Sequence, residues 1–320
     1  MLGRVTIILN DVCNSMCDYC YENRESVSLE EVKPSSITYF LGFVYNNFTI
    51  AHDCILEIIG GEPSLYNMWR DVVSIINNSK FNRVKVFTNG KIYIPELKDI
   101  IVDDAEIKIA LNNSNSNIVE KYKRDGLQVT EYFILNKKNL HQRPHDKPFL
   151  FTEYTNNAES DLSYDDVYHL TTDILISGET VDQRLFYVSK AMVGDMTFGS
   201  NSGCFPFVEE IAIRYDDKVV PCSRCKGIPI ELDLYSPNLY TEIREMAHKL
   251  VNIDVLGKTN GDLNCLECPL QGACQPCLMI KNDTLMTDRG LIHSFNKCEY
   301  ERMICKAQLD AYRDFKKGSS

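Results

Sequence analysis

Cysteine is distributed very unevenly along this chain, and that distribution limits the possible folds more than any other feature of the sequence. Cys13, Cys17 and Cys20 stand within eight residues near the amino terminus, and eight of the thirteen cysteines fall between Cys204 and Cys298. The start of the chain lacks the pattern of a signal peptide, which predicts a cytoplasmic protein. Because clustered cysteines in such proteins bind metals more often than they form disulfides, we expect two metal-binding regions.

The composition is that of an ordinary globular protein, and its charge disfavours some classes of partner. Hydrophobic residues make up 44% of the 320 residues and charged residues 25%. The net charge of −11 argues against nucleic acid as a partner, because affinity for a phosphate backbone requires clustered Lys and Arg. No apolar stretch reaches the roughly 18 residues of a membrane span, so we expect no association with a membrane.

Strands and helices alternate over the first two-thirds of the chain. The first strand is expected at 3–9, and five more follow at 54–59, 83–88, 106–111, 127–135 and 148–154. Apolar residues at helical spacing predict intervening helices from Ser35 on, from Leu65 to Ile76, and at 95–101, 117–123 and 164–174. This alternation predicts an α/β fold with a parallel sheet, open or closed into a barrel, with its chemistry at the carboxyl ends of the strands.

The pattern changes near residue 200, where regular structure becomes sparse and cysteine dense. A β-hairpin is expected from 210–214 and 218–220, a helix at 240–251, and a last helix near Cys298. We place a first domain at 1–197 and a second at 198–316, and we set 317–320 apart as a tail outside the fold.

The loop after the first strand carries three cysteines whose thiolates can surround one metal centre. Thiolate is a soft ligand that suits zinc or iron–sulfur. A structural zinc site normally closes with four ligands, whereas a 4Fe–4S cube held by three cysteines keeps one iron open for an outside molecule. A zinc loop, or three separate buried thiols, remains the alternative interpretation.

The spacing CxxxCxxC resembles the hallmark of radical S-adenosylmethionine (SAM) enzymes, and other segments extend the resemblance. Glycines let a backbone approach a ligand closely, and a carboxylate can pair with an ammonium group. In the family, the GGEP motif contacts the amino group of the methionine part of SAM in this way. By resemblance the cofactor-binding residues are Tyr19, Gly60, Gly61, Glu62, Pro63, Thr88 and Asn89. Asn112 stands where relatives often have Asp, so no role is assigned to it.

The resemblance implies a partial (β/α)6 TIM-like barrel and a 4Fe–4S cluster held by Cys13, Cys17 and Cys20. SAM would bind the open iron, and the reduced cluster would cleave it to a 5′-deoxyadenosyl radical that abstracts a hydrogen atom from the substrate. A flavodoxin- or ferredoxin-type protein would supply the electron. The barrel would place the substrate beside the radical and exclude water.

The second cysteine array resembles the SPASM extension of radical SAM enzymes, and a zinc ribbon is the alternative. Three features depart from that pattern: a gap of 17 residues between Cys204 and Cys222, Asp217 in place of a glycine, and CxxC at its end. By resemblance one auxiliary 4Fe–4S cluster would be held by Cys265, Cys268, Cys274 and Cys298. A second would be held by Cys204, Cys222, Cys277 and, by our inference, Cys225.

The number of auxiliary clusters, one or two, decides the role of the remaining thiols. If only one cluster is present, Cys222 or Cys225 could instead donate a hydrogen atom to a product radical, as in radical peptide epimerases. Cys54 and Cys305 are left over and are expected to pack in the core. The carboxylates that could act as a general base are Glu153, Glu209, Glu210, Asp216 and Asp217.

The resemblance favours a peptide or protein substrate, modified after ribosomal synthesis by cross-linking, thioether formation, epimerisation or oxidation. Only 12 residues precede Cys13, so we expect a separate leader-peptide-binding protein or the rim of the barrel to recruit the precursor. The alternatives are a radical SAM dehydrogenase of a small alcohol or sugar, a sulfatase-maturing enzyme, and a metal scaffold without catalysis.

Overall fold

The computed structural model describes most of the chain in two compact units. Residues 1–132 with 205–252 form the first unit, and 133–204 with 253–320 form the second. The described residues are 1–17, 30–110, 112, 114–143, 149–151, 161–178, 207, 209–223, 230–251, 284–287, 290–293 and 295–318.

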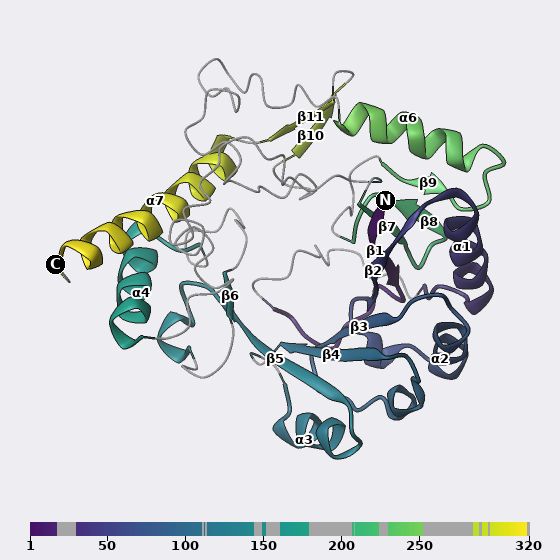
Figure 1. Ribbon diagram of the computed structural model, residues 1–320, viewed down its shortest axis with the longest axis horizontal. Coiled ribbons are helices and arrows are strands. Elements are labelled where there is room, and N and C mark those ends of the chain that lie inside the picture. Colours follow the sequence, from purple (N-terminus) through teal and green to yellow (C-terminus); the bar gives the residue numbers. More distant parts are fainter. Residues whose placement is uncertain are drawn as a thin grey trace. The chain divides into compact units, whose positions relative to one another are not determined.

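Parallel strands in sequence order build the sheet (Figure 1). The first unit contains β1 (Leu2–Ile8), β2 (Ile50–Ile59), β3 (Arg83–Thr88), β4 (Asp104–Ala110) and most of β5 (Gln128–Leu135), each paired in parallel with the next. In the second unit β6 (Phe149–Phe151) pairs in parallel with the last three residues of β5. Six parallel strands in sequence order confirm the α/β sheet that the alternation predicts.

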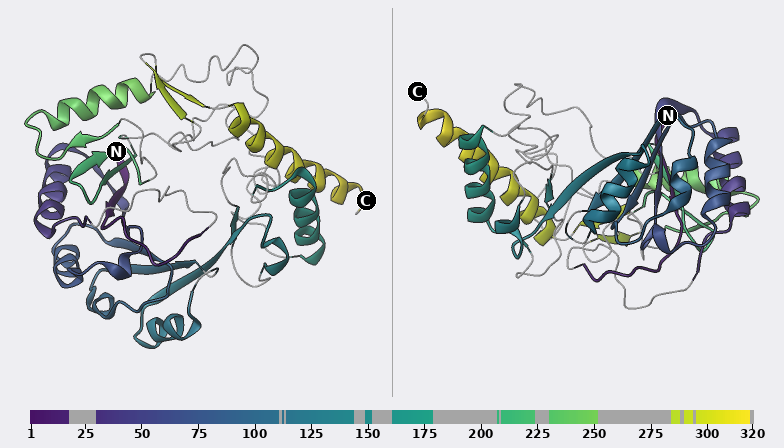
Figure 2. Two further views of the ribbon diagram at one scale, coloured as in Figure 1. Left: turned by 180° about the vertical axis from the view of Figure 1, so that it is seen from behind. Right: turned by 90° about the horizontal axis from the view of Figure 1, so that it is seen from below.

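Helices cover one face of this sheet in the first unit (Figure 2). They are α1 (Pro34–Asn47), α2 (Trp69–Asn77) and α3 (Ser116–Arg124), with the 3-10 turns η1 (Pro63–Leu65) and η2 (Pro95–Asp99). The face beneath them consists of alternate aliphatic residues that are buried, namely Val5, Ile7, Leu56, Ile58, Val84, Val86, Ile107 and Ile109. Because successive side chains of a strand point to opposite faces, the polar residues between them form the other face.

The chain forms η1 and α2 where the sequence predicts one helix from Leu65 to Ile76. The Glu62 carboxylate accepts a hydrogen bond from the Ser64 N–H at 2.9 Å, and the Trp69 indole donates to the Pro63 carbonyl at 2.7 Å. These bonds hold the short 3-10 turn, and α2 therefore begins only at Trp69.

A β-hairpin extends the sheet beyond β1. β7 (Glu210–Ile213) runs parallel to β1, and β8 (Lys218–Val220) and β9 (Leu232–Asp233) follow antiparallel. The sequence predicts the hairpin itself, but its place beside β1 depends on long-range pairing. α6 (Leu239–Val251) follows in the same unit. The domain boundary at 197/198 stays a prediction.

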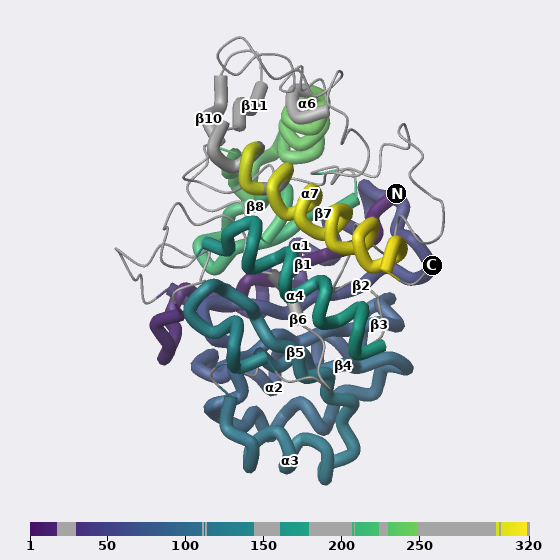
Figure 3. Tube along the Cα trace, turned by 90° about the vertical axis from the view of Figure 1, so that its left-hand side faces the viewer, coloured from purple at the N-terminus to yellow at the C-terminus, as the bar shows by residue number. Residues whose placement is uncertain are grey.

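Among the described residues of the second unit, two helices and a short hairpin accompany the end of β5, β6 and the turn η4 (Leu140–Gln142). α4 (Tyr164–Ser177) packs against α7 (Phe295–Gly318), as Figure 3 shows. Their interface buries Leu162, Val167, Tyr300, Ile304, Cys305 and Ala307. β10 (Thr284–Thr287) and β11 (Gly290–His293) form the antiparallel pair. α7 continues two residues into the tail that the sequence analysis sets apart.

Within the residues that the structure describes, no helix is both long enough and apolar enough to span a lipid bilayer.

The turn between β7 and β8 requires a left-handed residue. Asp217 has φ of +59°, its N–H donates to the Arg214 carbonyl at 3.1 Å, and its Oδ1 is buried without a hydrogen-bond partner among the described residues. A three-residue hairpin loop commonly ends in such a residue, and glycine fits there best. The structure thus gives a physical reason for a glycine at the position where the SPASM pattern has one and this chain has Asp217.

We expect Asp217→Gly to change the free energy of unfolding by less than about 1 kcal/mol. Relief of left-handed strain is opposed by the greater freedom of the unfolded chain. Asp217→Val should lower the free energy of unfolding by about 2 kcal/mol, because β-branched residues tolerate this region worst. Anaerobic urea unfolding followed by circular dichroism measures both changes, and a Val variant as stable as the native chain would contradict the explanation.

Candidate functional site

The loop that carries Cys13 and Cys17 leaves the carboxyl end of β1 and is closed at its base. The Val32 N–H donates to the Leu9 carbonyl at 2.9 Å, and Asn10 forms an isolated antiparallel bridge with Glu31. The returning segment is fixed in turn by a 2.7 Å hydrogen bond from the Tyr66 hydroxyl to the Val32 carbonyl. The cysteine loop, residues 11–30, therefore begins and ends at one place on the sheet.

The segment Gly60-Gly61-Glu62 lies directly against the start of this loop. The Gly61 N–H donates to the Asn10 carbonyl at 2.8 Å, and the Glu62 N–H donates to the Val12 carbonyl at 2.7 Å. A Cβ on Gly61 would lie 2.4 Å from the Val12 carbonyl oxygen, and one on Gly60 would lie 2.5 Å from the Asn10 Oδ1. Close packing within the chain thus requires these two glycines. The sequence interpretation attributed them instead to the close approach of a ligand.

The carboxylate of Glu62 joins the ends of two neighbouring strands. It is 1% exposed. Its Oε1 accepts hydrogen bonds from the Ser64 N–H at 2.9 Å and the Thr88 hydroxyl at 2.5 Å, and its Oε2 accepts one from the Asn89 N–H at 2.7 Å. A carboxylate has about four acceptor positions, so the described residues leave one of them for a ligand.

Asn89 continues this network into the cysteine loop. Its Nδ2 donates to the Asn14 Oδ1 at 2.7 Å and to the Ser15 Oγ at 3.1 Å, and it lies 3.9 Å from the Cys13 Sγ. The structure thus brings together segments that are far apart in the sequence: the cysteine loop, the end of β2 and the end of β3. Their roles toward a cofactor stay predictions.

Only some of the predicted metal ligands fall within the described residues. Cys13 and Cys17 carry half-buried thiols that form no disulfide, whereas Cys222 is buried two residues after β8. Cys298 lies in the first turn of α7, and its side chain is not described. Outside the described residues lie Tyr19, Cys20, Cys204, Cys225, Cys265, Cys268, Cys274 and Cys277. The ligand sets of all clusters therefore stay predictions.

The residues around Cys13 fit a thiolate-bound centre with a ligand that donates hydrogen bonds. Two thiols are partly accessible on one loop, and soft iron–sulfur centres are bound by such groups. Asn10 and Ser64 both form a hydrogen bond with Glu62. The Asn10 Oδ1 and the Ser64 Oγ are buried without a hydrogen-bond partner in the described part of the chain. Buried polar groups are usually paired, so these two atoms are available for hydrogen bonds to a bound molecule.

The face of the sheet opposite the helices carries a row of paired charged residues. Arg4 of β1 lies 3.3 Å from Glu57 of β2 and 3.4 Å from Glu210 of β7. On the next strands Lys85 and Lys108 lie 3.5 and 2.6 Å from Glu106. Burial raises the pKa of the Glu106 carboxyl, but hydrogen bonds from Lys108 and Thr130 and the two lysine charges outweigh it, so its pKa is below the ordinary value.

The carboxylates that the sequence proposes as a general base differ in burial and in their partners. Glu209 is exposed, and Asp216 pairs with Arg214 at 2.6 Å. Glu210 is buried on the polar face, where burial raises its pKa above the ordinary value against the opposing charge of Arg4. Its Oε1 accepts a hydrogen bond from the Ser223 N–H at 3.3 Å, next to Cys222. Glu153 lies outside the described residues.

Tyr132 belongs to this side of the sheet and was missed in the sequence analysis. It lies in the middle of β5, two residues beyond Thr130, and pairs in register with Ala110, the last residue of β4. Burial raises the pKa of its phenol to about 12, and the charges of Glu62 and Cys17 add to the shift. The two-residue period of Thr130 and Tyr132 along β5 is the sequence signal that could have identified it.

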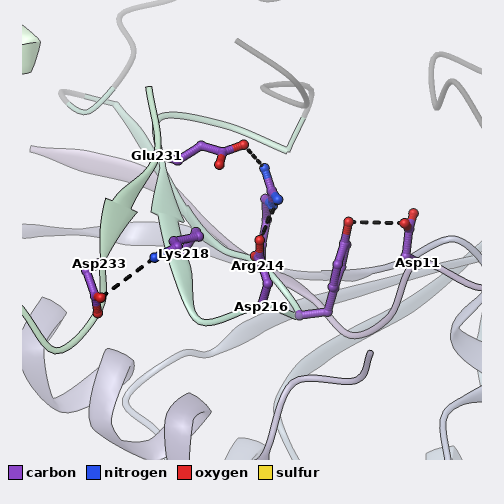
Figure 4. Close-up of polar contacts among 7 residues, drawn as sticks. Asp11, Arg214, Asp216, Lys218, Glu231 and Asp233 are labelled. Atoms are coloured by element: carbon purple, nitrogen blue, oxygen red, sulfur yellow. Dashed lines mark hydrogen bonds and ion pairs between the residues drawn. The ribbon is translucent and has the colours of Figure 1, made fainter. Parts of the chain in front are cut away.

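The β7–β8 hairpin also contacts the base of the cysteine loop (Figure 4). Arg214 pairs with Asp216 and with Glu231, and Lys218 lies 3.7 Å from Asp233. Next to this ion-pair network the Tyr215 hydroxyl donates to the Asp11 Oδ2 at 3.1 Å. The sequence gives no signal for this contact, because it joins residues that are distant along the chain.

Comparisons with known proteins identify the fold. No family profile matches the sequence, and no curated protein matches it. The solved structure of anSMEcpe with bound AdoMet is similar, with a TM-score of 0.66, 14% identity, and 99% of this chain and 100% of that chain covered. The structure of anSMEcpe with AdoMet and Kp18Cys peptide has a TM-score of 0.63 at 14% identity, with 97% and 98% covered.

A second protein shares the fold. SuiB of Streptococcus suis, bound to its precursor peptide SuiA, has a TM-score of 0.56 at 13% identity, with 87% of this chain and 72% of that chain covered. These similarities show that the chain has the fold of anSMEcpe and SuiB, and they confirm the α/β partial barrel. The SPASM-type domain stays a prediction.

We expect Gly61→Ala to lower the free energy of unfolding of the apoprotein by about 1–3 kcal/mol. The new Cβ would overlap the Val12 carbonyl and force the cysteine loop away from Glu62. Gly42→Ala in α1 is the matched control, because no atom lies within 4 Å of its Cβ and alanine favours a helix by about 0.5–1 kcal/mol. Urea unfolding should move the two variants in opposite directions, and a shift of both in one direction would refute the packing argument.

Proposed function

We propose that this protein is a radical SAM enzyme that modifies a peptide or protein. One observation carries the proposal: the Gly60-Gly61-Glu62 segment and Asn89 meet the loop of Cys13 and Cys17 at the carboxyl ends of adjacent parallel strands. The motifs that carry the family resemblance are thus neighbours in space, where an α/β fold places its chemistry.

The proposed cofactor is a 4Fe–4S cluster on Cys13, Cys17 and Cys20, with SAM on the open iron. When bound and reduced, this centre would supply the electron that cleaves SAM to a 5′-deoxyadenosyl radical. Glu62 would use its remaining acceptor position for the ammonium group of SAM, and the buried Asn10 Oδ1 offers a second acceptor beside it. Tyr132 would form part of the wall that excludes water.

A peptide substrate is supported by the fold rather than by a described binding groove. The anSMEcpe structure holds a peptide beside AdoMet, and the SuiB structure holds its precursor peptide. By this likeness we assign a peptide or protein substrate here. Cross-linking, thioether formation, epimerisation and oxidation all begin with abstraction of a hydrogen atom, so the chemistry of the site accommodates each of them.

We further propose a SPASM-type region with one or two auxiliary 4Fe–4S clusters. Two observations support it: the left-handed Asp217 where the pattern has glycine, and the buried Cys222 just after β8. A flavodoxin- or ferredoxin-type electron donor, a separate leader-peptide-binding protein and a cytoplasmic location complete the proposal.

The Cys13/Cys17/Cys20→Ala triple variant should lose SAM cleavage while it keeps its auxiliary iron. Anaerobically prepared native protein should contain about eight or twelve irons per chain, and the variant about four fewer, because each cube holds four. With dithionite and SAM, only the native protein should form 5′-deoxyadenosine, measured by liquid chromatography and mass spectrometry. Native protein that contains zinc instead, or iron that never cleaves SAM, would overturn the proposed function.

A further inference from the structure

Asn89 is held in a single orientation by the end of β3. Its backbone N–H is bound to the buried Glu62 carboxylate, and its Oδ1 accepts a hydrogen bond from the Lys91 N–H at 3.0 Å. Gly90, with φ of +67°, turns the chain between these two residues. Because the Oδ1 is used within its own turn, the Nδ2 must point the other way.

That other direction is the cysteine loop. The Nδ2 reaches three consecutive loop residues: the Asn14 Oδ1 at 2.7 Å, the Ser15 Oγ at 3.1 Å and the Cys13 Sγ at 3.9 Å. Ser15 is buried, so this contact is not a chance encounter of two surface side chains. The Lys91 Nζ adds a longer contact of 3.5 Å to the Asn14 carbonyl.

We propose that Asn89 is a positioning residue, which transmits the fixed position of the Glu62 carboxylate to the cysteine loop and so sets the orientation of Cys13 toward a cluster. The proposal rests on the proposed function and assigns Asn89 a role beyond contact with SAM. Hydrogen bonds around ligating sulfurs and their loops tune the potential of iron–sulfur centres, so this role predicts a measurable electronic effect.

The test uses full-length Asn89→Ala and Asn89→Ser, with Asn77→Ala as the matched control. Asn77 makes the same two kinds of bond far from the cysteine loop, since its Nδ2 donates to the Asp99 carbonyl and its Oδ1 accepts from the Ile101 N–H, both at 2.9 Å. Asn89→Ser keeps an acceptor for the Lys91 N–H but cannot reach the loop. If Asn89→Ala loses its cooperative unfolding transition, the Asn89→Ser variant alone is used to test the positioning role.

The first readout is independent of the cluster. Release of the cysteine loop should make the Cys13 thiol more accessible. In the apoprotein its rate of alkylation by iodoacetamide, followed by peptide mass spectrometry, should therefore rise several-fold in both Asn89 variants and stay unchanged in Asn77→Ala. Cys54 serves as the internal reference, because burial raises the pKa of its thiol to about 12.

The second readout is the electron paramagnetic resonance spectrum of the reduced protein with and without SAM. The triple cysteine variant supplies the signal of any other clusters, which is subtracted. Both Asn89 variants should change the remaining spectrum and shift its midpoint potential to more negative values, because a donor near the ligating sulfur is lost.

The outcomes separate the two proposals. If the native protein has a SAM-responsive spectrum but the Asn89 variants match the native protein and Asn77→Ala in both readouts, the positioning role is wrong and the proposed function stands. If the native protein has no SAM-responsive cluster, the proposed function fails. In that case an unchanged alkylation rate of Cys13 in the Asn89 variants also refutes the proposal that Asn89 positions the cysteine loop.

Discussion

The buried carboxylate of Glu62 is the interaction on which the arrangement of the site depends. Three hydrogen bonds hold it, from Ser64, Thr88 and Asn89, and they connect the end of β2 to the end of β3. Burial of a carboxylate is costly without hydrogen bonds, so these three contacts together hold Glu62 in place. The Asn89 side chain extends this hydrogen-bond network to Asn14 and therefore to the cysteine loop.

The two faces of the sheet have separate tasks. The face under α1, α2 and α3 consists of alternating aliphatic residues and supplies the core. The other face carries paired charges, with each carboxylate of the row beside an Arg or Lys. Pairing makes the burial of these charges tolerable, and it keeps a polar surface below the carboxyl ends of the strands. The two faces thus differ in their stabilising interactions, which are apolar packing on one face and ion pairs on the other.

The parts of the fold that depend on local periodicity could be predicted from the sequence, and the parts that depend on long-range pairing could not. The strand at 83–88 matches β3, and Pro34 does begin α1, because alternation and the fixed φ of proline are local properties. The place of β7 beside β1 has no local signal. Nor has the contact of Tyr215 with Asp11, which depends on that pairing.

The site shows the same division. The motif identifies Gly60, Gly61 and Glu62, but it does not show why glycine is required. A Cβ on Gly61 would meet the backbone of Val12, which is distant in the sequence. Asn89 was identified as a cofactor residue, yet its side chain binds the cysteine loop, a contact that only the fold reveals. Tyr132 was missed because a single aromatic residue on a strand is far more often part of a core.

We propose above all that the loop of Cys13 and Cys17 holds a cluster with one iron open to SAM. Electron–nuclear double resonance on the reduced protein with SAM labelled with ¹⁵N at its amino group tests this most directly. The account predicts a hyperfine coupling between the cluster and that nitrogen, which is absent in the Cys13/Cys17/Cys20→Ala variant. A reduced cluster on these cysteines that shows no coupling to labelled SAM would contradict it.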